Sequence, residues 1–142
     1  MIVLDVNVLL AVHRADHSQH DLARPWFDDL IAAAKPFAVP DVVCASFIRI
    51  STNRRIFTVP TPLADAFAFL HAVRQQPHHV ALDLGEHHFE IFERLCSETE
   101  SAGDLAMDAY LAAFAVETGA ALASFDRDFA RFPNLSWIRP GE

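Results

Sequence analysis

Lysine, cysteine and long hydrophobic runs are scarce in this sequence, and each scarcity excludes a class of protein. Lys35 is the only lysine, so a phosphate site built on several lysines is excluded. Cys44 and Cys96 lie far apart and indicate free thiols rather than a disulfide framework. No apolar run approaches the ~18 residues that a membrane helix requires. The apolar start carries no basic leader, so we expect a cytoplasmic protein that does not enter a membrane.

Positive charge is also scarce, and this limits the ways in which the chain can bind nucleic acid. The formal net charge is −8, whereas a protein that binds polyanions through charge alone is expected to be basic. An enzyme that binds RNA through a cation and a few local arginines is not excluded. The length of 142 residues and the 52% hydrophobic content predict one globular domain over residues 1–142.

Two apolar runs each lead into an aspartate. Residues 2–4 form a run without alternation, which is typical of a strand buried on both faces, and Asp5 ends it. Residues 120–125 repeat this plan and lead into Asp126. If the two runs are neighbouring parallel strands, the two aspartates face each other at the carboxyl edge of the sheet, where open α/β folds bind ligands.

Helical and strand-like patterns alternate along the rest of the chain. Further strands are expected at residues 37–39, 79–82 and 136–138, and a polar loop at residues 97–103. Helices are expected over five longer segments, after a short helix at residues 8–12: 22–34, 42–50, 62–73, 89–96 and 104–118. This alternation predicts a three-layer α/β domain with a mainly parallel central sheet.

The helix expected at residues 104–118 brings a further acidic pair to the same edge. Asp104 and Asp108 share one face near its start, and the helix leads directly into the strand that ends at Asp126. Helix and strand then run antiparallel, so Asp108 is expected close to Asp126. Three carboxylates at one edge cannot all ionise without raised pKa values or a bound cation, and oxygen ligands select Mg²⁺, with Mn²⁺ as an alternative.

The polar residues next to these acids have two possible roles, at the site or as helix caps. Asn7 and Ser124 are expected to hold the carboxylates or the attacking water, and the alternative for Asn7 is a simple cap of the first helix. Asp104 has the same alternative at the start of its own helix, because an acidic residue there interacts favourably with the helix dipole.

These pieces together resemble the PIN-domain ribonucleases, and more narrowly the VapC toxins of bacterial toxin–antitoxin pairs. The resemblance rests on Leu4-Asp5-Val6-Asn7, on Asp108-Ala109 with the alanines after it, and on Ser124-Phe125-Asp126-Arg127-Asp128-Phe129. It implies a PIN-like three-layer α/β/α fold with Asp5, Asp108 and Asp126 as catalytic, metal-binding acids. Asp128 is implied as an auxiliary acid, and Asp104 as an outer acid or a cap.

The same resemblance implies an activity and partners. It implies a Mg²⁺-dependent endoribonuclease that cleaves structured RNA, such as tRNA or rRNA, by attack of water. It also implies a VapB-like antitoxin that covers the crevice, a homodimer, and no direct binding of DNA. Arg49, Arg54 and Arg55, on or just after the helix expected at residues 42–50, are candidates for RNA binding; the alternative is a solvated helix end.

One position departs from the family pattern. Aligning the chain on Arg49 places Ser46 where such proteins commonly carry a glutamate. The loss of one acid is expected to weaken metal binding. The alternative reading is therefore a catalytically weak or silent PIN-like domain that binds RNA or a protein.

Other chemistries have less support in the sequence. The histidines at residues 78–79 and 87–88 are adjacent pairs that point to different faces, so they are poor chelates and are expected at the surface. An aspartyl-phosphate phosphatase requires an acid two residues after Asp5. Asn7 occupies that position, so this class is disfavoured. A receiver domain requires a lysine late in the chain. No lysine follows Lys35, so this class is also disfavoured.

Overall fold

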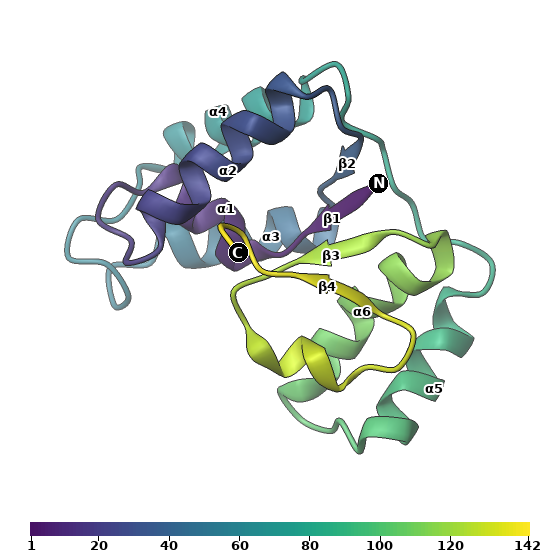
Figure 1. Ribbon diagram of the computed structural model, residues 1–142. Coiled ribbons are helices and arrows are strands. Elements are labelled where there is room, and N and C mark those ends of the chain that lie inside the picture. Colours follow the sequence, from purple (N-terminus) through teal and green to yellow (C-terminus); the bar gives the residue numbers. More distant parts are fainter.

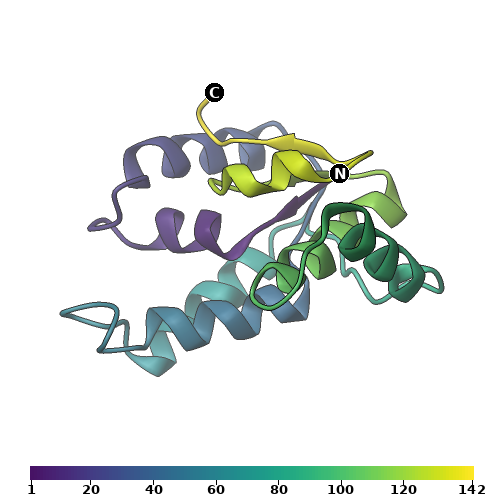
Figure 2. The ribbon, with the colours of Figure 1, turned by 90° about the horizontal axis from the view of Figure 1, so that it is seen from below.

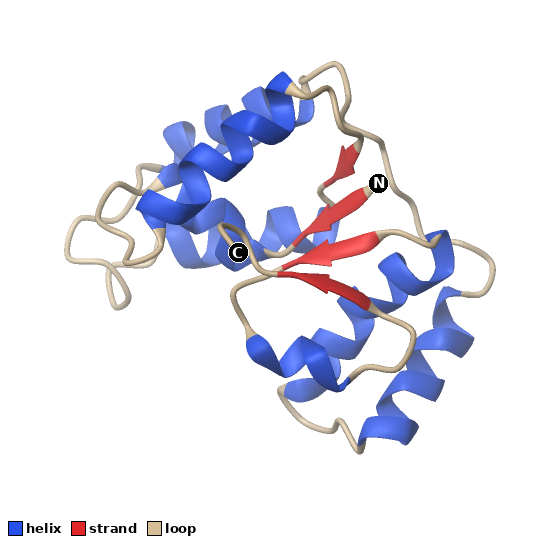
Figure 3. Ribbon diagram, viewed as in Figure 1, coloured by secondary structure: helices blue, strands red, loops and turns tan.

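Four parallel strands form the centre of the computed structural model, which describes residues 1–142. They lie in the order β2-β1-β3-β4, and their arrows run in one direction in Figure 3. The strands are β1 (Ile2–Leu4), β2 (Phe37–Ala38), β3 (Ala121–Ala123) and β4 (Ser136–Ile138). Val3, Leu4, Leu122 and Ala123 are fully buried, so the two central strands are covered on both faces, as their unbroken apolar runs predict.

Helices cover the sheet on both sides and confirm the three-layer α/β/α fold. Figure 1 shows their arrangement, and Figure 2 shows α2 on one side of the strands and α3, α4, α5 and α6 on the other. A short 3₁₀ helix, η1 (Arg127–Arg131), follows β3. The α-helices are α1 (Val6–His13), α2 (His20–Ala32), α3 (Asp41–Ser51), α4 (Leu63–Arg74), α5 (His88–Thr99) and α6 (Leu105–Thr118).

The alanine-rich helix α6 packs closely on the sheet and sets the position of the acids. Ala109, Ala112, Ala113 and Ala115 are fully buried, and α6 contacts both β1 and β3. Gly119 ends the helix in the left-handed conformation, with φ 67°, and the chain turns straight into β3. The start of α6 and the end of β3 therefore lie at the same edge of the sheet, as predicted. With 14 residues, α6 is the longest helix, and no helix could cross a membrane.

Two predicted segments differ from the structure. The strand expected at residues 79–82 is absent; only His79 bridges Phe37, because the two-residue strand β2 offers a very short free edge. The loop expected at residues 97–103 begins later, because α5 continues to Thr99. Glu100, with φ 53°, ends it in the left-handed conformation.

The histidines are not all at the surface. His88 is 3% exposed, its Nε2 atom lies 2.9 Å from the carbonyl oxygen of Tyr110, and its ring packs on Tyr110 and Phe114. The expectation of surface histidines is wrong at this position, because the first turn of α5 faces α6. The buried ring joins two helices.

Candidate active site

Three carboxylates converge where α6 begins and β3 ends. One oxygen atom each from Asp108, Asp126 and Asp128 lies within 4.8 Å of the other two. Asp108 stands on the first turn of α6, and the other two residues open the turn of η1. The Asp128 amide donates a hydrogen bond to Oδ1 of Asp126, at 2.9 Å, and this fixes the turn that presents both acids. Three oxygen donors so close together suit a hard divalent cation.

Asp5 lies beside this group but is not one of its three members. It precedes α1 and caps it, because its Oδ1 atom accepts a hydrogen bond from the Val6 amide at 2.7 Å. Its Oδ2 atom accepts one from the Ser124 hydroxyl, also at 2.7 Å. Burial raises the pKa of Asp5 to about 6; its two hydrogen bonds oppose this shift, and the charges of Asp108 and Asp126 add to it. The four acids thus form one electrostatic unit.

Ser124 connects the ends of the two central strands. Its hydroxyl is fully buried, donates to Asp5, and accepts hydrogen bonds from the Asp126 amide and the Asn7 side chain, both at 3.0 Å. The Asn7 side-chain oxygen in turn accepts a hydrogen bond from the Phe125 amide at 3.1 Å. The alternative reading of Asn7 as the helix cap is wrong, because Asp5 occupies that position. Asn7 and Ser124 instead hold the acid-bearing strand ends together.

Asp104 remains outside the acid group. It precedes α6, is exposed, and its side chain makes no capping hydrogen bond, so the cap predicted there is not formed. Asp108, one turn later, is half-buried and faces Asp126 and Asp128. Of the two aspartates that the sequence places on one helix face, only Asp108 therefore belongs to the acid group.

Arg131 is a charged neighbour of the acids that the sequence pattern did not reveal. Its Nη2 atom lies 3.5 Å from Oδ2 of Asp108, and its Nη1 atom donates to the carbonyl oxygen of Asp128 at 2.6 Å. The guanidinium also donates to the hydroxyl of Ser101 and stacks 4.2 Å above the ring of Phe132. Burial and the Asp126 charge raise the pKa of Asp108, and Arg131 opposes that rise. Only the 3₁₀ turn of residues 127–131 brings this arginine to the site.

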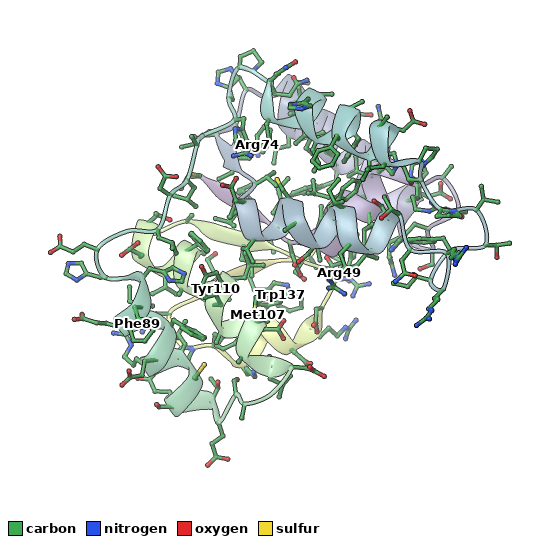
Figure 4. All side chains as sticks on the ribbon, turned by 180° about the vertical axis from the view of Figure 1, so that it is seen from behind. Arg49, Arg74, Phe89, Met107, Tyr110 and Trp137 are labelled. Atoms are coloured by element: carbon green, nitrogen blue, oxygen red, sulfur yellow. The ribbon has the colours of Figure 1, made fainter.

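A cavity of about 440 Å³ opens next to the acids, between α3 and α6. Asp5 and Asp108 lie on its wall, together with Ser46 and Arg49 of α3. Figure 4 shows Arg49, Met107 and Tyr110 on the side of the molecule where α3 and α6 face each other. The position of Ser46 therefore does face the acid site, as the alignment on Arg49 implies.

The predicted arginines separate into two groups. Arg49 lines the cavity, whereas Arg54 and Arg55 stand exposed in the loop after α3 and line none of the cavities. The Arg55 amide donates to the Asn53 side chain, at 2.8 Å, which shapes that loop. Among the three, Arg49 alone is placed beside the acids.

Comparison with known proteins agrees with this architecture. The PIN domain family model matches residues 2–135. Ribonuclease VapC25 of Mycobacterium tuberculosis is 55% identical over 140 residues, which is 99% of this chain and 99% of the relative. Ribonuclease VapC31 of the same species is 54% identical with the same coverage. The crystal structure of VapBC2 from Rickettsia felis bound to a DNA fragment from their promoter has a matching fold. Its TM-score is 0.71 at 19% identity, over 99% of both chains.

Proposed function

The chain belongs to the PIN domain family, and from this premise we propose that it is the VapC-type toxin of a toxin–antitoxin pair, an endoribonuclease that cleaves structured RNA such as tRNA or rRNA. The family assignment supports a ribonuclease, because the relatives at 54–55% identity are named ribonucleases. We propose that residues 1–142 form a single PIN domain.

The convergence of Asp108, Asp126 and Asp128 is the observation that carries the proposal. These three would hold Mg²⁺, or Mn²⁺ in its place, with Asp5 completing the acid set from the adjoining strand end. The donors are all oxygen, which fits a hard ion. A bound ion would supply a water of lowered pKa and stabilise charge on the phosphoryl oxygens.

The chain's own residues have separate tasks in this reaction. Asp5, held by the Ser124 hydroxyl beside Asp108, would help to bind the ion and orient the attacking water. Ser124 and Asn7 orient Asp5 and the strand end that carries Asp126. Arg49 binds a phosphate beside the acids, and the exposed Arg54 and Arg55 guide the RNA from the loop after α3.

The proposed partners follow from the same assignment. A VapB-like antitoxin covers the crevice, and a basic segment of it would complement the net charge of −8. The structural neighbour from Rickettsia felis is itself a toxin–antitoxin assembly bound to DNA. In our proposal this chain forms a homodimer in the cytoplasm and does not contact DNA directly.

Cleavage of purified tRNA and rRNA tests this function. The wild type is expected to cut a limited set of sites when Mg²⁺ or Mn²⁺ is present and none when EDTA is added. Asp126→Asn is expected to lose this activity, whereas Asp21→Asn, which removes an exposed charge on α2, keeps it. Equal cleavage by all three proteins would assign the activity to a contaminant, and absence of cleavage with every RNA would favour the silent alternative.

A further inference from the structure

The loop between α3 and α4, residues 52–62, carries the exposed Arg54 and Arg55 but has no helix or strand of its own. It projects beyond the ends of these two helices in Figure 2. Inside the loop, the carbonyl oxygen of Asn53 accepts a hydrogen bond from the Ile56 amide at 3.0 Å. Such local hydrogen bonds shape the loop, but its attachment to the rest of the molecule comes from the end of α1.

Arg14 follows α1, is only 9% exposed, and holds this loop. Its Nη2 atom donates to the carbonyl oxygen of Val59 at 2.8 Å, and its Nη1 atom donates to the hydroxyl of Thr61 at 3.2 Å. Its Cζ atom lies 3.8 Å from the centre of the Phe57 ring. One buried guanidinium therefore contacts three residues of the loop.

Neighbouring groups fix the orientation of this guanidinium. The Nε and Nη2 atoms of Arg14 both donate to the carboxylate of Asp16, at 2.8 and 2.7 Å, so the pair is bidentate. The Thr61 hydroxyl also lies 3.0 Å from Nε2 of His13. The Thr61 amide donates to the carbonyl oxygen of Ser51 at 2.8 Å. The network thus joins the end of α1 to both ends of the loop.

A buried arginine is a costly way to stabilise a fold. Removing a guanidinium from water has a large desolvation penalty, and apolar side chains of similar volume often stabilise a protein as well or better. The side chain of Asp16 is 63% exposed, so water weakens its attraction to Arg14. An arginine offers direction instead, because its planar fork fixes the positions of several partners at once. Such a contact is expected where the position of a loop matters for function.

We propose that Arg14 is a positioning residue for RNA binding: it holds the loop between α3 and α4 in one conformation, so that Arg54 and Arg55 present a preformed pair of guanidinium groups to the RNA backbone. A preformed pair loses less conformational freedom on binding than a mobile loop does. The held loop therefore raises the affinity for RNA and leaves the chemical step unchanged. The proposal rests on the nuclease function proposed above.

Partial digestion with trypsin tests whether Arg14 holds the loop. Trypsin cuts after arginine where the chain opens, so cutting after Arg54 or Arg55 measures the open fraction of the loop. Arg14→Lys keeps the positive charge but lacks the planar fork, and the rate of cutting in the loop is expected to rise about tenfold. Cutting after Arg94, within α5, requires wider unfolding and is expected to stay at the wild-type rate.

A matched pair of aspartate variants repeats the test without changing a buried side chain. Asp16→Asn removes the carboxylate that orients Arg14 and is expected to raise the rate of cutting in the loop about threefold. Asp28→Asn removes the carboxylate that pairs with the exposed Arg24 and is expected to leave that rate unchanged.

Binding of purified tRNA tests whether the held loop serves RNA. Affinity is measured by fluorescence anisotropy in EDTA at one salt concentration, so that cleavage does not interfere. Arg14→Lys is expected to weaken binding about fivefold in the wild-type background. In a protein that already carries Arg54→Gln and Arg55→Gln, its effect is expected to fall below about 1.5-fold, because the groups that it positions are gone. The rate of cleavage by Arg14→Lys at saturating tRNA with Mg²⁺ is expected to match the wild type.

The outcomes separate this role from the nuclease function. Equal rates of cutting in the loop of the wild type and of Arg14→Lys overturn the holding role. A loss of tRNA affinity that is the same with and without the two loop arginines overturns the positioning role and restricts Arg14 to stability, and tRNA binding that ignores Arg14 also overturns it. A wild type that binds tRNA in the expected pattern but cleaves no RNA with Mg²⁺ would reject the nuclease and keep the positioning role.

Discussion

The two halves of the acid site differ in how their carboxylates are held. On the β1 side, Asp5 is buried and both of its oxygen atoms accept hydrogen bonds. On the side of α6 and η1, Asp108, Asp126 and Asp128 are half-buried or exposed, and their oxygen atoms crowd within 4.8 Å. The Asp5 carboxylate finds its hydrogen-bond donors within the chain. The other three carboxylates repel one another, and a bound cation would relieve this repulsion. We call Asp5 with its hydrogen-bond partners the preformed half of the site, or its frame. Asp108, Asp126 and Asp128 form the open half, or open set.

The largest effect is expected from a matched pair of acids on α6. Asp108→Asn removes a member of the open set and is expected to lower the rate of RNA cleavage by about 100-fold or more. Asp104→Asn removes the same charge one turn earlier, outside the set, and is expected to change the rate less than about threefold. Cleavage rates at saturating Mg²⁺ measure both. Similar losses in the two variants would show that only the total charge of this helix end matters.

Next in size is the loss of the hydroxyl that joins the preformed half. Ser124→Ala leaves Asp5, Asn7 and the Asp126 amide without their shared partner in a fully buried position. The free energy of unfolding is expected to fall by about 2 kcal/mol, since buried polar groups become unpaired. Urea denaturation measures this value. Ser97→Ala, on the exposed face of α5, is the control and should lie within about 0.5 kcal/mol of the wild type.

A pH-dependent effect distinguishes the buried acid from the open ones. The pKa of Asp5 is raised in the folded state from 3.8 to about 6, so the folded protein holds this proton more tightly than the unfolded chain. Above pH 6 the buried charge therefore lowers stability, and below about pH 4 it has no effect. Without metal, Asp5→Asn is expected to raise the free energy of unfolding by about 1–2 kcal/mol at pH 7, after the loss of one hydrogen bond is deducted.

Denaturation curves at pH 4 and pH 7 in EDTA measure this difference. The gain from Asp5→Asn should disappear at the lower pH. A gain of equal size at both values would show that side-chain packing, rather than the buried charge, causes it.

The smallest effect is expected from the arginine that borders the open half. Arg131→Gln removes a positive charge 3.5 Å from Asp108 and is expected to lower the stability of the metal-free protein by about 1 kcal/mol at low salt. Mg²⁺ is expected to reduce this loss, because the ion takes over the neutralisation of the acids. Thermal melts with EDTA and with Mg²⁺ measure both values. A loss that is unchanged by Mg²⁺ would restrict Arg131 to its contacts with Ser101 and Phe132.

The frame of the site could be predicted from the sequence because it depends on periodic patterns. The apolar run before Asp5 and the alanine-rich helix leading to β3 each predict an element and its direction. Parallel strands and an antiparallel helix then place Asp108 near Asp126. The structure confirms the neighbouring strands through the pairing of Leu4 with Ala123.

The detail of the open half could not be predicted in this way. Asp128 joins the close group because of the η1 turn. Such a short turn leaves no periodic pattern in the sequence from which its position could be predicted. Arg131 reaches Asp108 through the same turn. Arg49 and Arg54 look alike in sequence, yet the end of α3 between them places one in the cavity and the other in a loop. Such positions depend on tertiary packing.

Diffraction from a crystal soaked in Mn²⁺ would show where the metal binds, because the anomalous signal locates the ion. We expect a peak within bonding distance of oxygen atoms of Asp108, Asp126 and Asp128, and no such peak in crystals of Asp126→Asn. A wild-type crystal with no peak at these three residues, or with Mn²⁺ bound only elsewhere on the surface, would contradict it.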